Sequence, residues 1–433
     1  MHDDLFPAAE KILTDIENVF KRDKQLQDFE IVPVTVGENK SPVLHAEHTL
    51  GLQEWCVRHL YVHVYHKVMN LKRQQRLRRE DPSVLSRLLL GGVLLNPDCT
   101  SLWNIRREFV VLGRYDPFTE LHINAITLSR RPKSAEAFVY RRWILKRITA
   151  DLLEAATLSS IVEEELRVSL MAADRYANNY HAWNHRMWVM SHIPQAQDIF
   201  YEEWTSSEMW VSKHVSEHSG LQYREFLLKQ VDQHLDHTDI CLKFHSTLVI
   251  FLSPLKHLTS HSESSKGSML SQRLYLSIID ILDKKEPCSH CPINCSGNIF
   301  ILQIAFLAFE LLLIKELIHL YPGHEALWCH RRFVLFCFKS LAKNISGNIT
   351  KETDILDGVP LPKAQKLSVL ETDNDNCFLW RLVMWHEEVL LKDYSTKSAE
   401  ESYQTKLALR HKKWIDNVLL SKKNNSCDAQ SIS

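Results

Sequence analysis

Glycine is scarce in this sequence, at 11 of 433 residues, and neither sign of charge predominates. Few glycines, together with apolar positions that recur at intervals of three and four, favour helix nearly throughout and leave few strand signals. The 52 basic and 53 acidic residues nearly cancel, so no global field attracts nucleic acid or an anionic membrane surface. We therefore expect a helical protein without a nucleic-acid partner.

We expect neither an export signal nor a membrane-spanning run. Its N-terminus mixes Asp3 and Glu10 with apolar residues, and has neither the basic start nor the apolar block of a signal peptide. The longest apolar run, residues 299–314, is broken by Gln303 and Glu310 and is shorter than the ~20 residues that a bilayer requires. It predicts a buried helix. The ten cysteines then indicate thiols in a reducing compartment, and we expect a cytoplasmic protein.

A short aromatic and arginine word recurs along the chain. In its first copy, residues 96–107, Trp103 is followed three and four residues later by Arg106 and Arg107. The word returns as Phe138, Arg141 and Arg142, as Trp183 and Arg186, as Trp328 and Arg331, weakly at Leu221, and without its arginine at Trp380. Length alone allows either several domains or one repeat array, and this self-similarity favours the array.

The spacing of these anchor residues predicts helical hairpins. The anchors Trp103, Phe138, Trp183 and Leu221 are separated by 35, 45 and 38 residues, which is the length of two helices and a turn. A second aromatic follows most anchors by five residues, so each helix carries two apolar faces and is sandwiched between neighbours. For most of these aromatic and arginine residues we expect a structural role.

The predicted organisation has four parts. They are an N-terminal helical region at 1–80, repeats at 81–395 with an insertion at about 255–298, a C-terminal helix at 396–420, and a disordered tail at 421–433.

The repeated word, from Pro97 to Trp385, is similar to the repeat of protein prenyltransferase α subunits. Ordinary tetratricopeptide arrays have a stricter 34-residue period and a different pattern. The resemblance implies an all-α fold, a right-handed α-α superhelix of hairpins that forms a crescent around a barrel-shaped β subunit. It further implies that the β subunit carries the zinc ion and most of the isoprenoid pocket, and that this chain binds no metal or cofactor itself and is inactive alone.

The resemblance also assigns candidate site residues. In the family, a lysine five residues before the second anchor approaches the isoprenoid diphosphate, and that position is Lys133 here. A fixed ammonium there would stabilise the charge that develops on the leaving diphosphate. Asn179, Tyr180 and His181 match residues that line the same interface in the family. The bland alternatives are a solvated lysine in a turn and a packing role for the other three.

Two neighbours of Lys133 depart from the farnesyltransferase version of the repeat. Ala135 replaces a tyrosine, and Glu136 replaces a glutamine that meets the C-terminal carboxylate of a CaaX substrate. A carboxylate facing a carboxylate repels it, so we expect ordinary CaaX recognition to be impaired. The resemblance therefore favours the β subunit of the Rab geranylgeranyltransferase as partner, with geranylgeranyl diphosphate and a protein that has a cysteine near its C-terminus as substrates.

One segment has the spacing of a metal site, and its members are Cys288, His290, Cys291 and Cys295. The segment is short and isolated, and we expect no metal there. His185, His330 and His386 lie in or beside repeat cores and are expected to be packed or solvated.

Three function classes remain open from sequence. The first is the α subunit of a protein geranylgeranyltransferase, which Lys133 and the run from Asn179 to His181 favour. The second is a non-catalytic scaffold that binds proteins on a solenoid surface, which the losses at Ala135 and Glu136 favour. The third is a regulator that competes for a β subunit.

Overall fold

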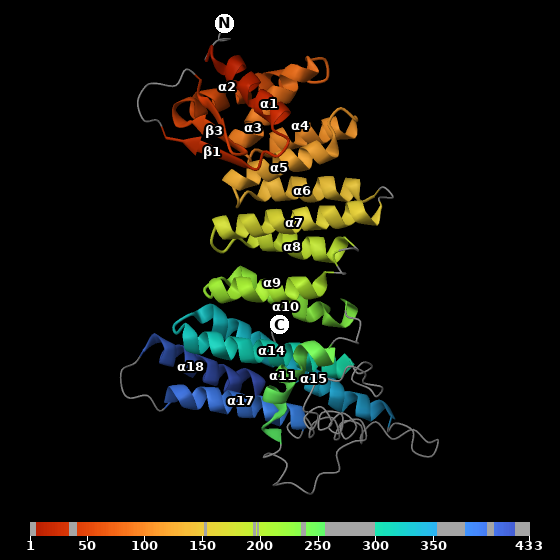
Figure 1. Cartoon of the computed structure of the whole chain (residues 1–433), viewed down its shortest axis with the longest axis vertical. Helices are drawn as coiled ribbons and strands as arrows, with labels where there is room; N and C mark the ends of the chain where they lie inside the picture. The colour runs from red at the N-terminus through yellow and green to blue at the C-terminus, as the bar shows by residue number, and fades with distance from the viewer. Residues whose placement is uncertain are drawn as a thin grey trace, which may run out of the picture. The chain divides into compact units, whose positions relative to one another are not determined.

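The computed structural model describes residues 6–33, 41–150, 154–193, 196, 199–234, 240–255, 299–352, 377–395 and 402–420. Apart from one small sheet, the regular structure in these residues is helical (Figure 1). This confirms the predicted all-α repeat class. The chain divides into two compact units, Met1–Ile199 and Phe200–Ser433.

The N-terminal part of the first unit contains a sheet as well as helices. Its elements are α1 (Ala9–Arg22), β1 (Asp28–Val32), β2 (Val43–Ala46), β3 (Thr49–Gln53) and α2 (Glu54–Arg73). The strand order is β1-β3-β2, with β1 parallel and β2 antiparallel to β3. The N-terminal region predicted to be helical, residues 1–80, thus contains this sheet as well as α1 and α2. The strands are short, and only the pairs Phe29/Ile31 and Leu50/Leu52 alternate as strand residues do.

Three helical hairpins follow in the first unit. They are α3 (Pro82–Leu95) with α4 (Thr100–Val111), α5 (Pro117–Arg130) with α6 (Ala135–Ile148), and α7 (Ala155–Arg175) with α8 (Tyr180–His192). The first helices α3, α5 and α7 contact one another in sequence order, and the second helices α4, α6 and α8 do the same (Figure 1). Every interior helix is therefore packed on two sides, as the paired aromatic positions predict.

The proline and polar residues of the word mark the start of each second helix. In α6, for example, Ser134 is the N-cap and its side chain accepts a hydrogen bond from the Ala137 amide at 3.3 Å. The anchor then lies in the first turn, where Trp103, Phe138, Trp183 and Trp328 are all buried.

The second unit continues the hairpin pattern. Its pairs are α9 (Phe200–Lys213) with α10 (His218–His234), α14 (Ile299–Leu320) with α15 (Glu325–Glu352), and α17 (Phe378–Ser395) with α18 (Tyr403–Trp414), which runs into a π-helical turn at Ile415–Leu419. A further helix, α11 (Ile240–Leu252), packs against α14. The buried helix predicted for residues 299–314 is confirmed by α14. The 421–433 tail and the insertion beyond Leu255 lie outside the described residues.

Candidate functional site

In four copies of the word, the first arginine makes a buried ion pair with the next hairpin. Arg141 of α6 donates from Nε and Nη2 to the Glu165 carboxylate of α7 at 2.6 and 2.7 Å, and from Nη1 to the Leu121 carbonyl at 2.9 Å. Both side chains are buried. The same pairing joins Arg106 to Glu120, Arg224 to Glu310 and Arg331 to Glu387. Each of these four arginines therefore fastens its hairpin to the one that follows.

In four copies of the word, the residue just before the arginine also binds a glutamate. Its side chain hydrogen bonds, at 2.6–2.8 Å, to a glutamate on the first helix of the same hairpin, and this glutamate lies 20 residues earlier in the chain. The four residues are Tyr140, His185, Tyr223 and His330. Glu165, for example, is held by Arg141 from the preceding hairpin and by His185 from its own. The sequence predicts that His185 and His330 are packed or solvated. In the structure both are buried, and each is hydrogen-bonded to a glutamate.

Burial and ion pairing compete in setting the charge of these groups. Burial raises the pKa of Glu310, but Arg224 and His330 outweigh it and bring the pKa to about 2. Burial lowers the pKa of His185 and prevails there. His330 differs because the Glu225 carboxylate lies 3.5 Å from its Nδ1 in addition to Glu310, and its pKa is raised despite burial.

The last copy of the word lies elsewhere than the sequence predicted. Trp380 is buried in α17, which is the first helix of its hairpin, and the arginine beside it, Arg381, is exposed. The second helix is α18, where His411 bonds the Glu387 carboxylate at 2.9 Å. By that register the anchor position is Leu409, which is 53% exposed, unlike the buried anchors of the other copies. An aliphatic residue there hid the repeat, although Trp414 keeps the aromatic five residues on.

Lys133 lies in the turn between α5 and α6, and its side chain is exposed. Its Nζ is 4.4 Å from the centroid of the Tyr176 ring. Tyr176 is the first residue of the turn between α7 and α8. Among the described residues, no carboxylate forms a salt bridge with this ammonium. The turn thus presents a positive charge that an aromatic face supports and no described anion neutralises.

The run from Asn179 to His181 divides into a buried and an exposed part. Asn179 is fully buried and caps α8, and its Nδ2 donates to the carbonyls of Pro132 and Ala172 at 2.6 and 2.9 Å. This side chain therefore holds the Lys133 turn and does not face solvent. Tyr180 is 48% exposed, and its ring lies 3.9 Å from that of His181.

His181 lies within electrostatic range of Lys133, Arg142 and Asp98. Burial lowers the pKa of the half-buried His181 imidazole, the charges of Arg142 and Lys133 lower it further, and the Asp98 carboxylate opposes them. Arg142 is half-buried, and burial lowers its pKa too. Glu136 and Ala135 occupy the first turn of α6 and are both half-buried. Lys133 and Arg142, the second arginine of the same word, thus both lie near enough to His181 to act on its charge.

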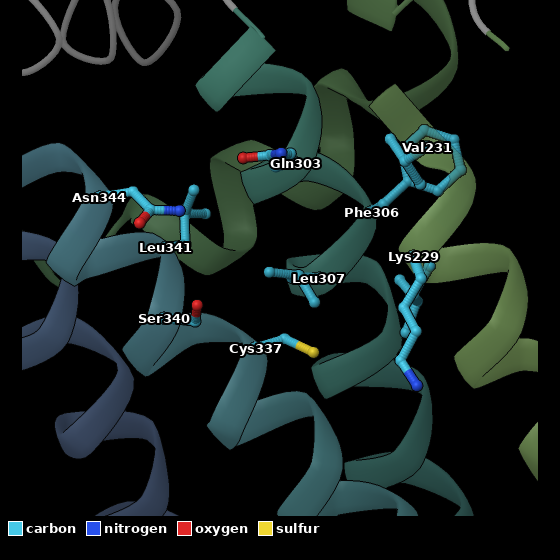
Figure 2. Close-up of a pocket in the computed structure, with 10 residues that line it drawn as sticks. Lys229, Val231, Gln303, Phe306, Leu307, Cys337, Ser340, Leu341 and Asn344 are labelled. Carbon is cyan, nitrogen blue, oxygen red and sulfur yellow. The ribbon is translucent and has the colours of Figure 1, made fainter. Parts of the chain in front are cut away.

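A pocket lies in the other unit, apart from these residues. It has a volume of about 180 Å³ and is lined by α10, α14 and α15, with Lys229, Leu307 and Cys337 among its walls (Figure 2). The lining residues from α15 are Cys337, Ser340, Leu341 and Asn344.

The described residues were also compared with the requirements of a metal site and of a membrane-spanning helix. Within the ranges that the structure describes, no group of three or more His, Cys, Asp or Glu side chains is placed to hold a metal ion. Cys288, His290, Cys291 and Cys295 lie outside those ranges. No helix in the described ranges combines the length and apolar character that a bilayer crossing requires.

Comparison with known proteins agrees with this arrangement. A family model described as the protein prenyltransferase alpha subunit repeat matches residues 162–193 and 307–338. The Xenopus laevis protein named protein prenyltransferase alpha subunit repeat-containing protein 1-B is 32% identical over 376 residues, covering 81% of this chain and 78% of its own. The chain belongs to this family of prenyltransferase α-subunit repeat proteins.

Further members show the same degree of similarity. The human protein prenyltransferase alpha subunit repeat-containing protein 1 is 31% identical over 344 residues, covering 76% of this chain and 77% of its own. The Danio rerio protein of that name is 31% identical over 347 residues, covering 76% and 72%. The two segments that match the α-subunit repeat lie in the hairpins α7–α8 and α14–α15 and contain the histidine-bearing words at His185 and His330. The suspected family is thereby confirmed.

Proposed function

We propose that this chain is the α subunit of a heterodimeric protein geranylgeranyltransferase. In this proposal a β subunit carries the zinc ion and the lipid pocket, and the reaction transfers a geranylgeranyl group from its diphosphate to a cysteine near the C-terminus of a protein. We place the complex in the cytoplasm and take the β subunit to be of the Rab geranylgeranyltransferase type. The observation that carries the proposal is the exposed, unneutralised Lys133 ammonium on a turn that Asn179 holds in place.

Lys133 would act on the charge of the leaving group. As the bond between the isoprenoid carbon and the diphosphate oxygen breaks, negative charge grows on the diphosphate. An ammonium on a fixed turn stabilises that charge without first having to be ordered. Arg142 contributes to the same field, because it lies close enough to His181 to lower the pKa of that imidazole together with Lys133. A bound anion would raise the pKa of His181 and favour uptake of a proton from solvent, which would add a further positive charge.

The second helices of the first unit supply a surface suited to a β subunit. The Arg107 guanidinium carbon lies 5.8 Å from the Trp143 ring centroid, and the Lys146 Nζ lies 6.0 Å from that of Trp188. Helix α8 contains no Asp or Glu, and Val139 of α6 is 43% exposed. A basic and aromatic face of this kind fits an acidic partner surface with apolar contacts.

A Lys133→Ala variant tests the catalytic role. The chain would be co-purified with a candidate β subunit and assayed for single-turnover transfer from labelled geranylgeranyl diphosphate. Removal of one buried oxyanion donor costs ~10²–10³-fold in rate, and because Lys133 is exposed we expect about 10- to 100-fold, with β-subunit binding unchanged. Lys11→Ala, at an exposed position of α1, is the matched control. Equal rates for the two variants would remove the catalytic role.

A second candidate is a non-catalytic scaffold. It is favoured by Ala135 and Glu136, which replace the family's substrate-facing tyrosine and glutamine. The names of the relatives also specify the repeat and no activity. Recovery of the chain from cytosol without any β subunit, and without transfer activity, would support the scaffold. Recovery of a stoichiometric β subunit with label on a protein cysteine would exclude it.

A further inference from the structure

Strand β1 is docked on the ends of two helices that lead directly into the candidate site. Phe29 of β1 is buried, and its amide donates to Ser129 Oγ of α5 at 3.0 Å. The Arg130 guanidinium carbon lies 5.6 Å from the Phe29 ring centroid. Because β1 is an edge strand of its sheet, its outer side is free to make these contacts. The sheet is thereby attached to the last residues of α5.

Arg175, the last residue of α7, links the same strand to both helices. Its Nη2 donates to Asp28 Oδ1 of β1 at 2.6 Å, and its Nη1 donates to the Ser129 carbonyl of α5 at 2.5 Å. One guanidinium therefore ties β1, the end of α5 and the end of α7 together. The pair with Asp28 is partly exposed and worth little by itself, so the three-way connection is what matters.

The two turns that carry the candidate site begin within four residues of these contacts. Ser129 and Arg130 precede Pro132 and Lys133, and Arg175 precedes Tyr176. The Lys133 Nζ lies over the Tyr176 ring. Asn179, the N-cap of α8, also binds this turn, because its Nδ2 donates to the Pro132 carbonyl. The Lys133 turn is thus held from one side by α8 and from the other by β1.

We propose that β1, acting through Arg175, is a brace that positions Lys133 for prenyl transfer. This rests on the proposed function, since it concerns the same ammonium. Asp28, Phe29 and Arg175 are positioning residues and touch no substrate. Releasing the brace lets the two turns move apart, so that Lys133 leaves the ring of Tyr176 and no longer meets the developing charge in a fixed place. The N-terminal sheet is then a means by which a distant event changes the transfer rate.

An Arg175→Met variant of the full chain tests the brace. Methionine keeps much of the apolar stem while removing both hydrogen bonds. Asp28→Asn is a milder second variant should the first fold poorly. Arg147→Met is the control, because Arg147 is an exposed arginine in the last turn of α6. We expect amide hydrogen exchange in residues 131–134 and 176–180 to increase about tenfold in Arg175→Met and to stay unchanged in Arg147→Met.

The transfer assay then separates positioning from general weakening. With a β subunit, Arg175→Met should lower the rate at saturating substrate about three- to tenfold and leave the KM for the protein substrate unchanged. In a Lys133→Ala background it should have no further effect. Unchanged exchange in the two turns, or an equal rate loss with and without Lys133, would overturn the brace. The exchange measurement needs no β subunit, so a wild-type chain without transfer activity refutes the proposed function and leaves the brace to be judged by exchange alone.

Discussion

Replacement of Arg141 by methionine removes one partner of a fully buried ion pair and leaves the other in place. Glu165 would lose the two hydrogen bonds at 2.6 and 2.7 Å and keep only His185. An uncompensated buried charge of this kind costs ~3–5 kcal/mol. Because His185 remains, we expect the lower half of that range. The Leu121 carbonyl also loses its hydrogen-bond donor, which adds to the loss of stability.

The assay is native-state hydrogen exchange on the full chain, read from peptides in α6, α7 and α8. A loss of ~3–4 kcal/mol, the lower half of that range, corresponds to roughly 150- to 900-fold faster exchange in those peptides. Stability in a repeat array is set by nearest neighbours, so α14 and α15 should be unaffected. Arg167→Met, which breaks an exposed pair, should cost no more than ~1 kcal/mol. If Arg141→Met changes exchange no more than Arg167→Met does, the ion-pair account of the repeats is wrong.

Two further predictions concern the second unit. Glu310 and Glu387 have pKa values of about 2 against an ordinary 4.5; because the folded value is the lower one, their stabilisation is complete above about pH 4.5 and is lost as the pH falls toward about 2. Peptides of α14 and α17 should therefore exchange faster at pH 3 than at pH 5 after correction for intrinsic rates, and equal protection would contradict this. Gly220→Ala places a new Cβ 2.3 Å from the Trp210 ring, so we expect a loss of about 1–3 kcal/mol in chemical denaturation. Gly91→Ala, whose Cβ meets the flexible end of Leu13, should lose less, and equal losses would count against the steric account.

The hairpins could be predicted from sequence because their signal is local. Trp103, Phe138, Trp183 and Trp328 each lie in the first turn of a second helix, and the turn residues precede them at fixed distance. The glutamates that pair with the arginines were not predicted, because their distance from the arginine along the chain is not fixed. Arg224 and Glu310 are 86 residues apart and Arg106 and Glu120 only 14, so no fixed interval between arginine and glutamate exists to be found.

The sequence does contain a regular interval that points to these buried glutamates. The aromatic or imidazole residue directly before the arginine lies 20 residues after its glutamate in four hairpins. Glu310 even interrupts an otherwise apolar helix, where a lone carboxylate requires a buried partner. The β1 contacts were beyond reach, because Asp28 and Arg175 are separated by 147 residues and a strand of five residues carries little periodicity.

These two kinds of spacing decide where the chain can grow. In the four hairpins where that interval is 20 residues, a residue inserted within either helix, between the glutamate and its tyrosine or histidine, would rotate one side chain about 100° away from the other. Added sequence between hairpins changes nothing in that register, as the wide range of arginine-to-glutamate separations shows. Among the described pairs the interval inside a hairpin is 20 or 24 residues, whereas the interval across a joint runs from 14 to 86. Length therefore accumulates at the joints between hairpins.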